Sequence, residues 1–420
     1  MIRFAVAAAV AVVTPAAAQT VVVTADRMLD VTSGRTVERP AVVIVDGRIA
    51  TVGTQGSIAI PTGATRIDLV GKTILPGLID MHVHLSSTPL IGGYRRFQYT
   101  DAFWTAIAVA NARATLEAGF TTVRNLGADG YADVAVRQGV DGGFFPGPRV
   151  VAATDSFGAT GGHCGGTNLL PPRFAGETER GINGAEAVRA KVRLNRKYGA
   201  DVIKVCATGG VFSANTEPGA QQMTEAELRA AADEAHMLNM KVAAHAHGTE
   251  GIKAAIRAGI DTIEHVSFID DEGVALAKQR GTWLGFDVYN TEYTLAEGEK
   301  NGVLRENIDK ERQVGTVQRD NFRRAARAGA KMIFSTDAGI YPHGHNAKQF
   351  AVMVRLGMTP IEAIRSATAN AADALGRKGQ VGVIAPGAWG DMIAVDGDPL
   401  ADVSTLERPA AVIKGGTRVR

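Results

Sequence analysis

The sequence predicts an α/β protein, a (β/α)8 TIM barrel that carries a small β-sandwich domain built from both ends of the chain. Through the middle of the 420 residues, short apolar stretches alternate with Ala-rich helical stretches. About eight of these apolar stretches can be counted, the number of parallel strands that closes such a barrel. Both flanks change to short strands of alternating apolar and polar residues with Gly and Asp turns.

The two flanks predict one discontinuous domain. The first flank, residues 19–76, contains Ala41-Val42-Val43-Ile44-Val45-Asp46-Gly47, and the second, residues 379–420, contains Asp391-Met392-Ile393-Ala394-Val395-Asp396-Gly397. Their shared pattern predicts strands and hairpins of a single β-domain. Residues 77–378 are then the barrel domain.

The first 18 residues predict a secretory signal peptide. Arg3 precedes an Ala/Val-rich run, and Ala16-Ala17-Ala18 forms a small-residue cleavage site before Gln19. An ordinary buried helix is the alternative. We expect a mature protein that is periplasmic or secreted.

Composition limits the partners. The formal net charge is +2 and no basic block stands out, so neither nucleic acid nor an anionic membrane surface is expected as a partner. Beyond the N-terminus, no apolar run reaches the roughly 20 residues that span a bilayer. A small-molecule substrate is the expected partner.

The barrel elements are assigned from their patterns. The expected strands are residues 78–84, 121–125, 149–152, 201–206, 241–245, 262–265, 282–287 and 331–336. The expected helices between them include residues 102–118, 185–198, 225–238, 251–258 and 320–328. An open doubly wound sheet is the alternative, but it usually has a Gly-rich turn after its first strand, whereas this first strand ends in histidines.

Histidines and an aspartate follow several of these strands. His82 and His84 end the first strand on the same side and can share one metal ion. His245, His265 and Asp337 end the fifth, sixth and eighth strands, where barrels place their reactive groups. A single histidine is more often structural, but four histidines and an aspartate at matching strand ends predict a metal site.

Lys204 lies inside the otherwise apolar fourth strand. Burying an ammonium group without a partner is costly, so pairing with a carboxylate or a position at a helix seam is the structural alternative. A buried amine with a lowered pKa can instead react with carbon dioxide, which converts it into an anionic ligand able to bridge two metals.

The chain resembles the amidohydrolase superfamily in its binuclear subtype with a carboxylated lysine. The resemblance covers nearly the whole mature chain. Its motifs are Pro76-Gly77-Leu78-Ile79-Asp80-Met81-His82-Val83-His84, Ile203-Lys204-Val205, Ala244-His245-Ala246, Glu264-His265 and Ser335-Thr336-Asp337-Ala338-Gly339.

The resemblance implies a role for each residue. His82, His84 and Asp337 would bind one metal and His245 and His265 the other. Lys204, as N6-carboxylysine, and a hydroxide would bridge two divalent ions, most often Zn²⁺ in this family. Asp337 would also move the proton from the nucleophile to the leaving nitrogen. A homo-oligomer is implied, with an octamer as one candidate state.

The loops after the strands supply candidate substrate contacts. His163, in the Gly-rich loop of residues 156–166, resembles a histidine near the substrate carbonyl in prolidase- and carboxypeptidase-like members, so it is assigned to transition-state stabilisation. A phosphate cradle is the rejected rival, because no Lys-Ser/Thr follows. Tyr289 is a substrate contact or a packed residue, and His247 a substrate contact or a support for the site.

The roles of some other loop residues are not decided by the sequence. His343 is counted as a candidate substrate contact, although the roles of both His343 and His345 are undecided. The spacing of Cys164 and Cys206 does not say whether they pair.

These motifs favour a metal-dependent hydrolase that cleaves the amide bond to a C-terminal amino acid. The resemblance is to prolidase-like peptidases, Lys/Arg carboxypeptidases and ochratoxin-degrading amidohydrolases, and its substrates would be dipeptides or N-acyl amino acids, including ochratoxin A. Two alternatives remain: a cyclic-amide hydrolase of the imidazolonepropionase type and a non-catalytic periplasmic metal- or ligand-binding protein.

Overall fold

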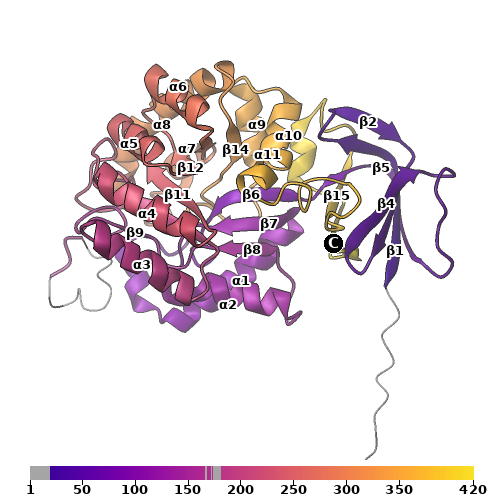
Figure 1. Ribbon diagram of the computed structural model, residues 1–420, viewed down its shortest axis with the longest axis horizontal. Coiled ribbons are helices and arrows are strands. Elements are labelled where there is room, and N and C mark those ends of the chain that lie inside the picture. The colour runs from indigo at the N-terminus through magenta and orange to yellow at the C-terminus, as the bar shows by residue number, and fades with distance from the viewer. Residues whose placement is uncertain (1–18, 166–167, 172, 174–180) are drawn as a thin grey trace, which may run out of the picture.

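Both ends of the chain meet in one sheet, at one side of the molecule (Figure 1). The computed structural model describes residues 19–165, 168–171, 173 and 181–420, so the expected signal peptide lies outside the described residues. The sheet has eight strands in the order β17-β16-β15-β5-β1-β3-β4, with β2 paired to β1. They are β1 (Thr20–Asp30), β2 (Arg35–Glu38), β3 (Pro40–Val45), β4 (Arg48–Thr54), β5 (Thr65–Pro76), β15 (Met392–Asp396), β16 (Ala411–Lys414) and β17 (Thr417–Arg418).

This terminal sheet has its own apolar core, in which Val23, Ile44, Ile74 and Met392 are buried together. The pairing of β5 with β15 joins the two chain ends. Because pairing connects all eight strands in one sheet, a division into the two layers of a sandwich stays a prediction, as do the domain boundaries.

The central strands are parallel and form two sheets. One contains β6 (Leu78–Val83), β7 (Phe120–Asn125) and β8 (Arg149–Ala152). The other contains β9 (Phe157–Gly158), β10 (Val202–Cys206), β11 (Lys241–Ala246), β12 (Thr262–His265), β13 (Trp283–Phe286) and β14 (Met332–Phe334). All eight expected strands are present, and the two-residue β9 is an addition that the sequence did not indicate.

Hydrogen bonds cross both gaps between these parallel sheets. The Asp201 amide, just before β10, donates to the Ala152 carbonyl of β8 at 2.8 Å. The Asp337 amide, just after β14, donates to the His82 carbonyl of β6 at 2.8 Å. The described strands therefore approach a ring, although no continuous ladder closes it.

Helices surround the parallel strands (Figure 1). They are α1 (Asp101–Glu117), α2 (Ala132–Asp141), α3 (Ala185–Lys197), α4 (Glu225–Met237), α5 (Thr249–Arg257), α6 (Asp271–Arg280), α7 (Asn290–Glu297), α8 (Arg305–Arg327), α9 (Lys348–Arg355), α10 (Pro360–Ser366) and α11 (Ala369–Ala374). Thr224 and Thr359 begin α4 and α10 with capping boxes, which satisfy amides that a helix leaves unpaired at its start. Within the described chain, no helix combines the length and apolar character needed to cross a membrane.

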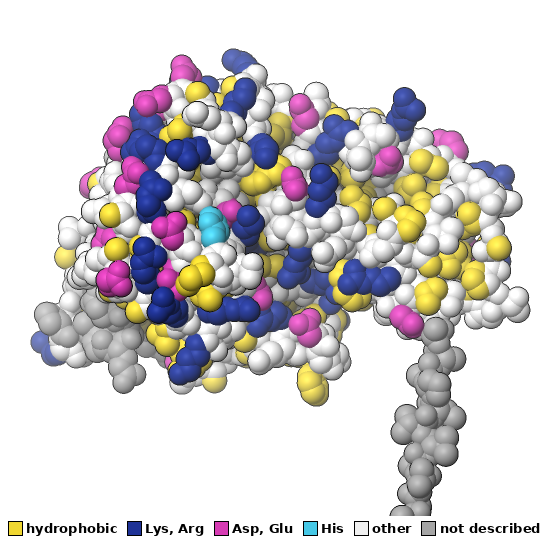
Figure 2. Space-filling view, in the orientation of Figure 1, with side chains coloured by type: hydrophobic (Ala, Val, Ile, Leu, Met, Phe, Trp, Pro, Cys, Tyr) yellow, Lys and Arg dark blue, Asp and Glu magenta, His cyan; other side chains and the backbone are white. Residues whose placement is uncertain are grey.

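The surface agrees with the small net charge. Figure 2 shows basic and acidic side chains interspersed over the visible face. The main core is mostly aliphatic and includes several aromatic residues, among which Phe334 stacks on Phe350 with ring centroids 4.3 Å apart. The parallel strands are therefore held rigidly, and their ends can position side chains accurately.

Candidate metal centre

Strand β6 and the segment after β14 bring three candidate ligands together. His82 Nε2 and His84 Nε2 are 3.3 Å apart, because residues two apart on an extended strand point to the same side. Asp337 Oδ1 lies 3.4 Å from His82 Nε2 and 3.2 Å from His84 Nε2. The hydrogen bonds of Asp337 and His84 across the gap between β6 and β14 fix this arrangement.

Lys204 of β10 reaches the same point. Its side chain is 3% exposed, and its Nζ lies 3.4 Å from His82 Nε2. Burial lowers the pKa of Lys204 to about 8. None of the ion pairs among the described residues includes Lys204, so the expected alternative of a direct carboxylate partner is not found there.

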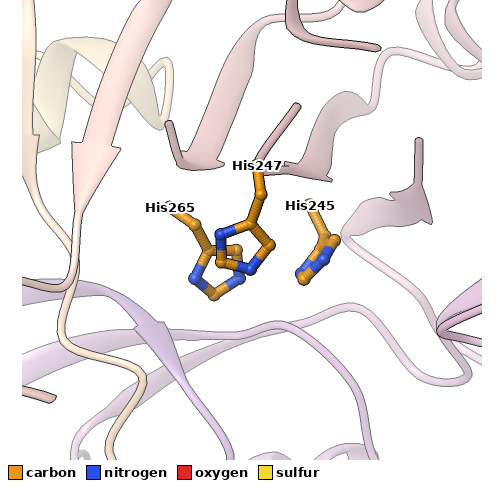
Figure 3. A group of neighbouring side chains, drawn as sticks. All are labelled: His245, His247 and His265. Atoms are coloured by element: carbon orange, nitrogen blue, oxygen red, sulfur yellow. The ribbon is translucent and has the colours of Figure 1, made fainter. Parts of the chain in front are cut away.

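A second group consists of three histidines whose side chains cluster together (Figure 3). Ligand atoms of His245, His247 and His265 lie within 4.8 Å of one another, and His265 belongs equally to a group with His82 and Asp337. The two groups therefore share a residue and form one continuous cluster.

Each histidine of the second group uses one ring nitrogen to contact a neighbouring polar group. His245 Nε2 lies 3.0 Å from the Gly209 carbonyl, His247 Nδ1 lies 2.8 Å from Ser267 Oγ, and His265 Nδ1 lies 3.1 Å from Asp287 Oδ2. Metal-binding histidines are held by this type of contact, which leaves the other nitrogen for the metal.

The donor set fits a metal site. Two ligand atoms that are each about 2.0–2.2 Å from one tetrahedral ion lie about 3.3–3.6 Å apart, close to the separations of the His82, His84 and Asp337 atoms. His82 Nδ1 and Glu264 Oε2 are buried, have no hydrogen-bond partner among the described residues and lie 3.5 Å apart. So many nitrogen and oxygen atoms around a shared space are typical of a metal centre.

Burial determines the charge of most of these histidines. It lowers the pKa of His82, His245 and His247 well below the ordinary histidine value, so they are neutral, as a metal ligand must be. Burial also acts to lower the pKa of His265, but the contact with the Asp287 carboxylate has the larger effect and raises the pKa of this histidine. For Asp337, His82 and His84 outweigh the effect of burial and lower the pKa.

Backbone strain also concentrates here. Asp337 has a backbone φ of 58° and His265 one of 72°. Both lie in the left-handed region, which residues other than glycine rarely adopt. Such strain is typical of functional sites, where the surrounding structure imposes it.

Charged residues in the parallel strands support the ligands, and the sequence reasoning did not identify them. Arg124 donates to the Met81 carbonyl at 2.6 Å and to Glu264 Oε1 at 2.6 Å, and both side chains are buried. Asp80 accepts a hydrogen bond from Thr336 Oγ1 at 2.6 Å. Asp80, Arg124 and Glu264 could have been found by the pattern that singled out Lys204, which is a charged residue inside an apolar strand.

His163 lies beside the cluster. Its ring stacks on His245 with centroids 4.1 Å apart, and its Nδ1 lies 2.8 Å from Ser213 Oγ. Burial lowers the pKa of His163 to about 3, so the ring is neutral. The adjacent Cys164 forms a disulfide with Cys206 of β10, which answers the question that the spacing left open.

A cavity of about 410 Å³ opens over the cluster, and all six predicted metal ligands, His163 and His247 line it. Apolar side chains such as Phe97, Trp104 and Phe212 form much of its remaining wall. Water-excluding walls around a few polar groups are typical of substrate sites.

Three sequence candidates lie away from this cavity in the described structure. Tyr289 packs against Tyr341 with ring centroids 5.0 Å apart, which matches its alternative as a packed residue. His343 contacts Thr115 Oγ1 at 2.9 Å and the His84 carbonyl at 3.1 Å, so it supports the loop after β14. His345 is exposed and is not among the described lining residues.

Comparisons with known sequences indicate the family of the chain. The profile of the Amidohydrolase family matches residues 73–419. Ochratoxinase from Aspergillus niger is 33% identical over 412 residues, which cover 91% of this chain and 83% of that protein. Imidazolonepropionase from Nocardia farcinica is 27% identical over 383 residues, which cover 85% of each protein.

Solved structures are similar over almost the whole chain. A Xaa-Pro dipeptidase with methionine bound in its active site has a TM-score of 0.90 at 35% identity, with 96% of this chain and 100% of that chain covered. A prolidase complexed with N-methylphosphonate-L-proline has a TM-score of 0.87 at 32% identity, with 96% and 99% covered.

Proposed function

The chain belongs to the amidohydrolase family and is a hydrolase, and on that premise we propose that it cleaves the amide bond to a C-terminal amino acid. The proposed substrates are dipeptides and N-acyl amino acids, including ochratoxin A. Family membership and the similar solved structures also imply a TIM-barrel-like fold for the parallel strands. Convergence of the His82, His84, Asp337 and Lys204 side chains on one point beneath the cavity is the observation that carries the proposal.

The cluster would hold two divalent metal ions, with Zn²⁺ as the proposed metal. His82, His84 and Asp337 would bind one ion, and His245 and His265 the other, with carboxylated Lys204 shared between them. Two such ions polarise a substrate carbonyl and lower the pKa of a bound water. His247, whose Nδ1 lies 2.8 Å from Ser267 Oγ, would support the second ion or contact substrate.

Carboxylation of Lys204 would give its burial a chemical purpose. The neutral amine attacks carbon dioxide, a carbon–nitrogen bond forms, and one proton leaves to solvent. The pKa of about 8 leaves about a tenth of the amine neutral at pH 7, far more than at the ordinary lysine pKa. The resulting carbamate is an anion that can balance the positive charge of two metal ions, whereas an ammonium group would repel them.

The remaining chemistry falls to Asp337 and His163. Asp337 would accept a proton from the attacking water and deliver it to the leaving nitrogen, which a carboxylate facing the cavity can do. His163 would donate from Nε2 to the oxygen of the substrate carbonyl as negative charge develops there. The apolar walls would limit water around both groups.

A substrate screen tests this function. The purified enzyme, loaded with zinc, is offered a library of dipeptides and N-acyl amino acids with ochratoxin A included, and amino-acid release is measured. We expect release of the C-terminal amino acid from members of this class. Turnover of cyclic amides alone would support the alternative related to imidazolonepropionase, and no turnover of any amide would overturn the proposal.

We also propose export and self-assembly, which rest on the sequence. The protein recovered outside the cytoplasm should begin at Gln19, as N-terminal sequencing can determine. Light scattering of the purified protein should give a mass above that of one chain. A retained residue 1 in exported protein, or a monomeric mass, would contradict the respective proposal.

A further inference from the structure

A buried carboxylate that the proposed mechanism does not use lies in the cavity wall. Glu311 of α8 is 4% exposed, and it lines the cavity together with Asn307, Val314 and Gln318. These residues recur at intervals of three or four, so they occupy one face of the helix. The helix therefore presents Glu311 toward the space where substrate would bind.

Glu311 lacks the charged partner that a buried carboxylate normally requires. Thr291 Oγ1 donates to Glu311 Oε1 at 2.5 Å, and within the described chain no ion pair includes Glu311. His265 and Arg319 influence Glu311 electrostatically, but His265 contacts the carboxylate of Asp287 and Arg319 that of Glu292. A buried carboxylate without a cation in contact is costly, so its position beside a cavity points to a cation that arrives with a ligand.

The distance along α8 relates Glu311 to the metal cluster. Gln318 donates to Asp287 Oδ1 at 2.6 Å, and Asp287 in turn contacts His265. Glu311 lies seven residues before Gln318, which is about 10 Å along a helix axis. The carboxylate therefore lines the same cavity as the metal cluster but lies about two helical turns from Gln318, where a second polar group of a small substrate could reach it.

We propose that Glu311 recognises a protonated amine on the substrate and so selects among the amides that the site hydrolyses. This inference rests on the proposed function. The amine is either the α-ammonium of a dipeptide or the ammonium of a basic side chain. Burial raises the pKa of Glu311 to about 7, and a bound ammonium would favour its ionised form.

Two pairs of substrates, each differing in one ammonium group, separate these sources. L-alanyl-L-phenylalanine is compared with propionyl-L-phenylalanine, and propionyl-L-lysine with propionyl-L-norleucine. kcat/KM is measured for all four in the wild type and in Glu311→Gln, which preserves the shape of the side chain and an oxygen for Thr291. Asp309→Asn is the matched control, because Asp309 is an exposed carboxylate of the same helix that pairs with Arg305 and Arg312.

We expect the wild type to favour the ammonium member of at least one pair by about tenfold in kcat/KM, the effect of one hydrogen bond to a charged group. Glu311→Gln should abolish this preference mainly through KM while it hydrolyses the neutral member at a rate close to that of wild type. The pair that responds identifies the source of the amine. Asp309→Asn should keep the preference.

Three outcomes would overturn the inference. A wild type without any ammonium preference would do so, as would a preference that survives in Glu311→Gln; both would leave the proposed function intact. Failure of the wild type to hydrolyse all four compounds would overturn the proposed function and the inference with it. Retained turnover of the neutral substrates shows that Glu311→Gln is folded.

Discussion

At the scale of single residues, Asp337 joins several functions in one side chain. Its carboxylate contacts His82 and His84, its backbone is in the left-handed region, and it lines the cavity. A carboxylate in this position can bind a metal and still exchange a proton with a neighbouring substrate.

Replacing Asp337 by Asn should therefore nearly abolish hydrolysis. We expect kcat to fall by about 10²–10⁴-fold, because an amide cannot accept the proton. Amino-acid release from the best substrate of the screen measures the loss, and metal analysis separates it from loss of the ions. Asp320→Asn, at an exposed position of α8, is the control. Hydrolysis by Asp337→Asn as fast as by wild type would rule out the mechanism.

Ser213 should control the orientation and the protonated nitrogen of His163. Its hydroxyl lies between His163 Nδ1 at 2.8 Å and Thr216 Oγ1 at 2.5 Å. When Thr216 donates to Ser213 and Ser213 donates to Nδ1, the proton of the ring is on Nε2, where the proposed role of His163 requires it.

Ser213→Ala should lower kcat by about tenfold with a smaller change in KM, because the interaction matters most as charge develops on the carbonyl oxygen. Metal content should remain that of wild type, and Ser213→Thr, which keeps a hydroxyl, should recover most of the activity. Steady-state kinetics of the two variants provide the measurement. Equal kcat in Ser213→Ala and wild type would remove Ser213 from this role.

The sequence predicts the proposed ligands better than the groups that hold them. His82, His84, Lys204 and Asp337 could be found because each follows or interrupts an apolar strand at a recognisable motif. Asp287 ends an expected strand and Ser213 lies in a loop, but neither stands in a recognisable motif, and only folding brings them against His265 and His163. Tyr289 was a candidate substrate contact that instead packs against Tyr341, because an aromatic residue after a strand can equally pack into the core.

At the scale of elements, the disulfide ties the loop of His163 to strand β10. Cys164 follows His163 directly, and Cys206 ends the strand that carries Lys204. Their Cα atoms are 5.8 Å apart. The link restrains the loop on the side of the cavity where the substrate carbonyl is expected.

Reduction of this disulfide should destabilise the protein and lower its activity. A link across 42 residues of sequence contributes about 2–4 kcal/mol in typical proteins. The melting temperature and kcat should fall together in the presence of dithiothreitol, with two thiols titrated per chain. A Cys164→Ala/Cys206→Ala variant should show the same lower values and no response to the reductant. An unchanged melting temperature in fully reduced wild type would contradict the prediction.

Helix α8 is an element that apolar spacing predicts only in part. The sequence predicts only residues 320–328 as helical, whereas the helix begins at Arg305. Before residue 320 it carries Asn307, Glu311 and Gln318 on the buried face, so apolar spacing is interrupted there. That face borders the cavity, and the same polar residues that hide the helix from pattern recognition supply the proposed amine site.

At the scale of the whole molecule, the terminal sheet is attached to the parallel strands through Trp389. The guanidinium groups of Arg48 and Arg149 each lie 3.6 Å from the centroid of its ring. Arg149, at the start of β8, also donates to Asp391 at 2.9 Å. The contact therefore joins β4, β8 and the segment before β15.

Trp389→Ala should weaken this attachment. Loss of the large ring should lower the free energy of unfolding by about 3 kcal/mol, because both guanidinium groups lose their packing surface. Thermal unfolding followed by circular dichroism measures the change. Phe144→Ala removes an aromatic ring that is 85% exposed and should leave the melting temperature unchanged. Equal stability of both variants would show that Trp389 has no such role.

The overall arrangement of strands could be predicted because each parallel strand is a short buried run, a pattern that survives without knowledge of its neighbours. Closure of the strands into a ring depends on long-range pairing at the gaps, which local patterns do not encode. The layers of the β-sandwich are not encoded locally either, because alternation of apolar and polar residues indicates strands but not which strands share a layer.

The central claim is that one cluster holds two metals and that Lys204 is part of it. The most direct test is the number of zinc ions per chain, measured by elemental analysis of wild type, Lys204→Ala and the control Lys241→Ala, whose lysine is half-exposed at the start of β11. The account predicts two ions per chain in wild type and control and fewer than two in Lys204→Ala. Two ions per chain in Lys204→Ala would contradict it.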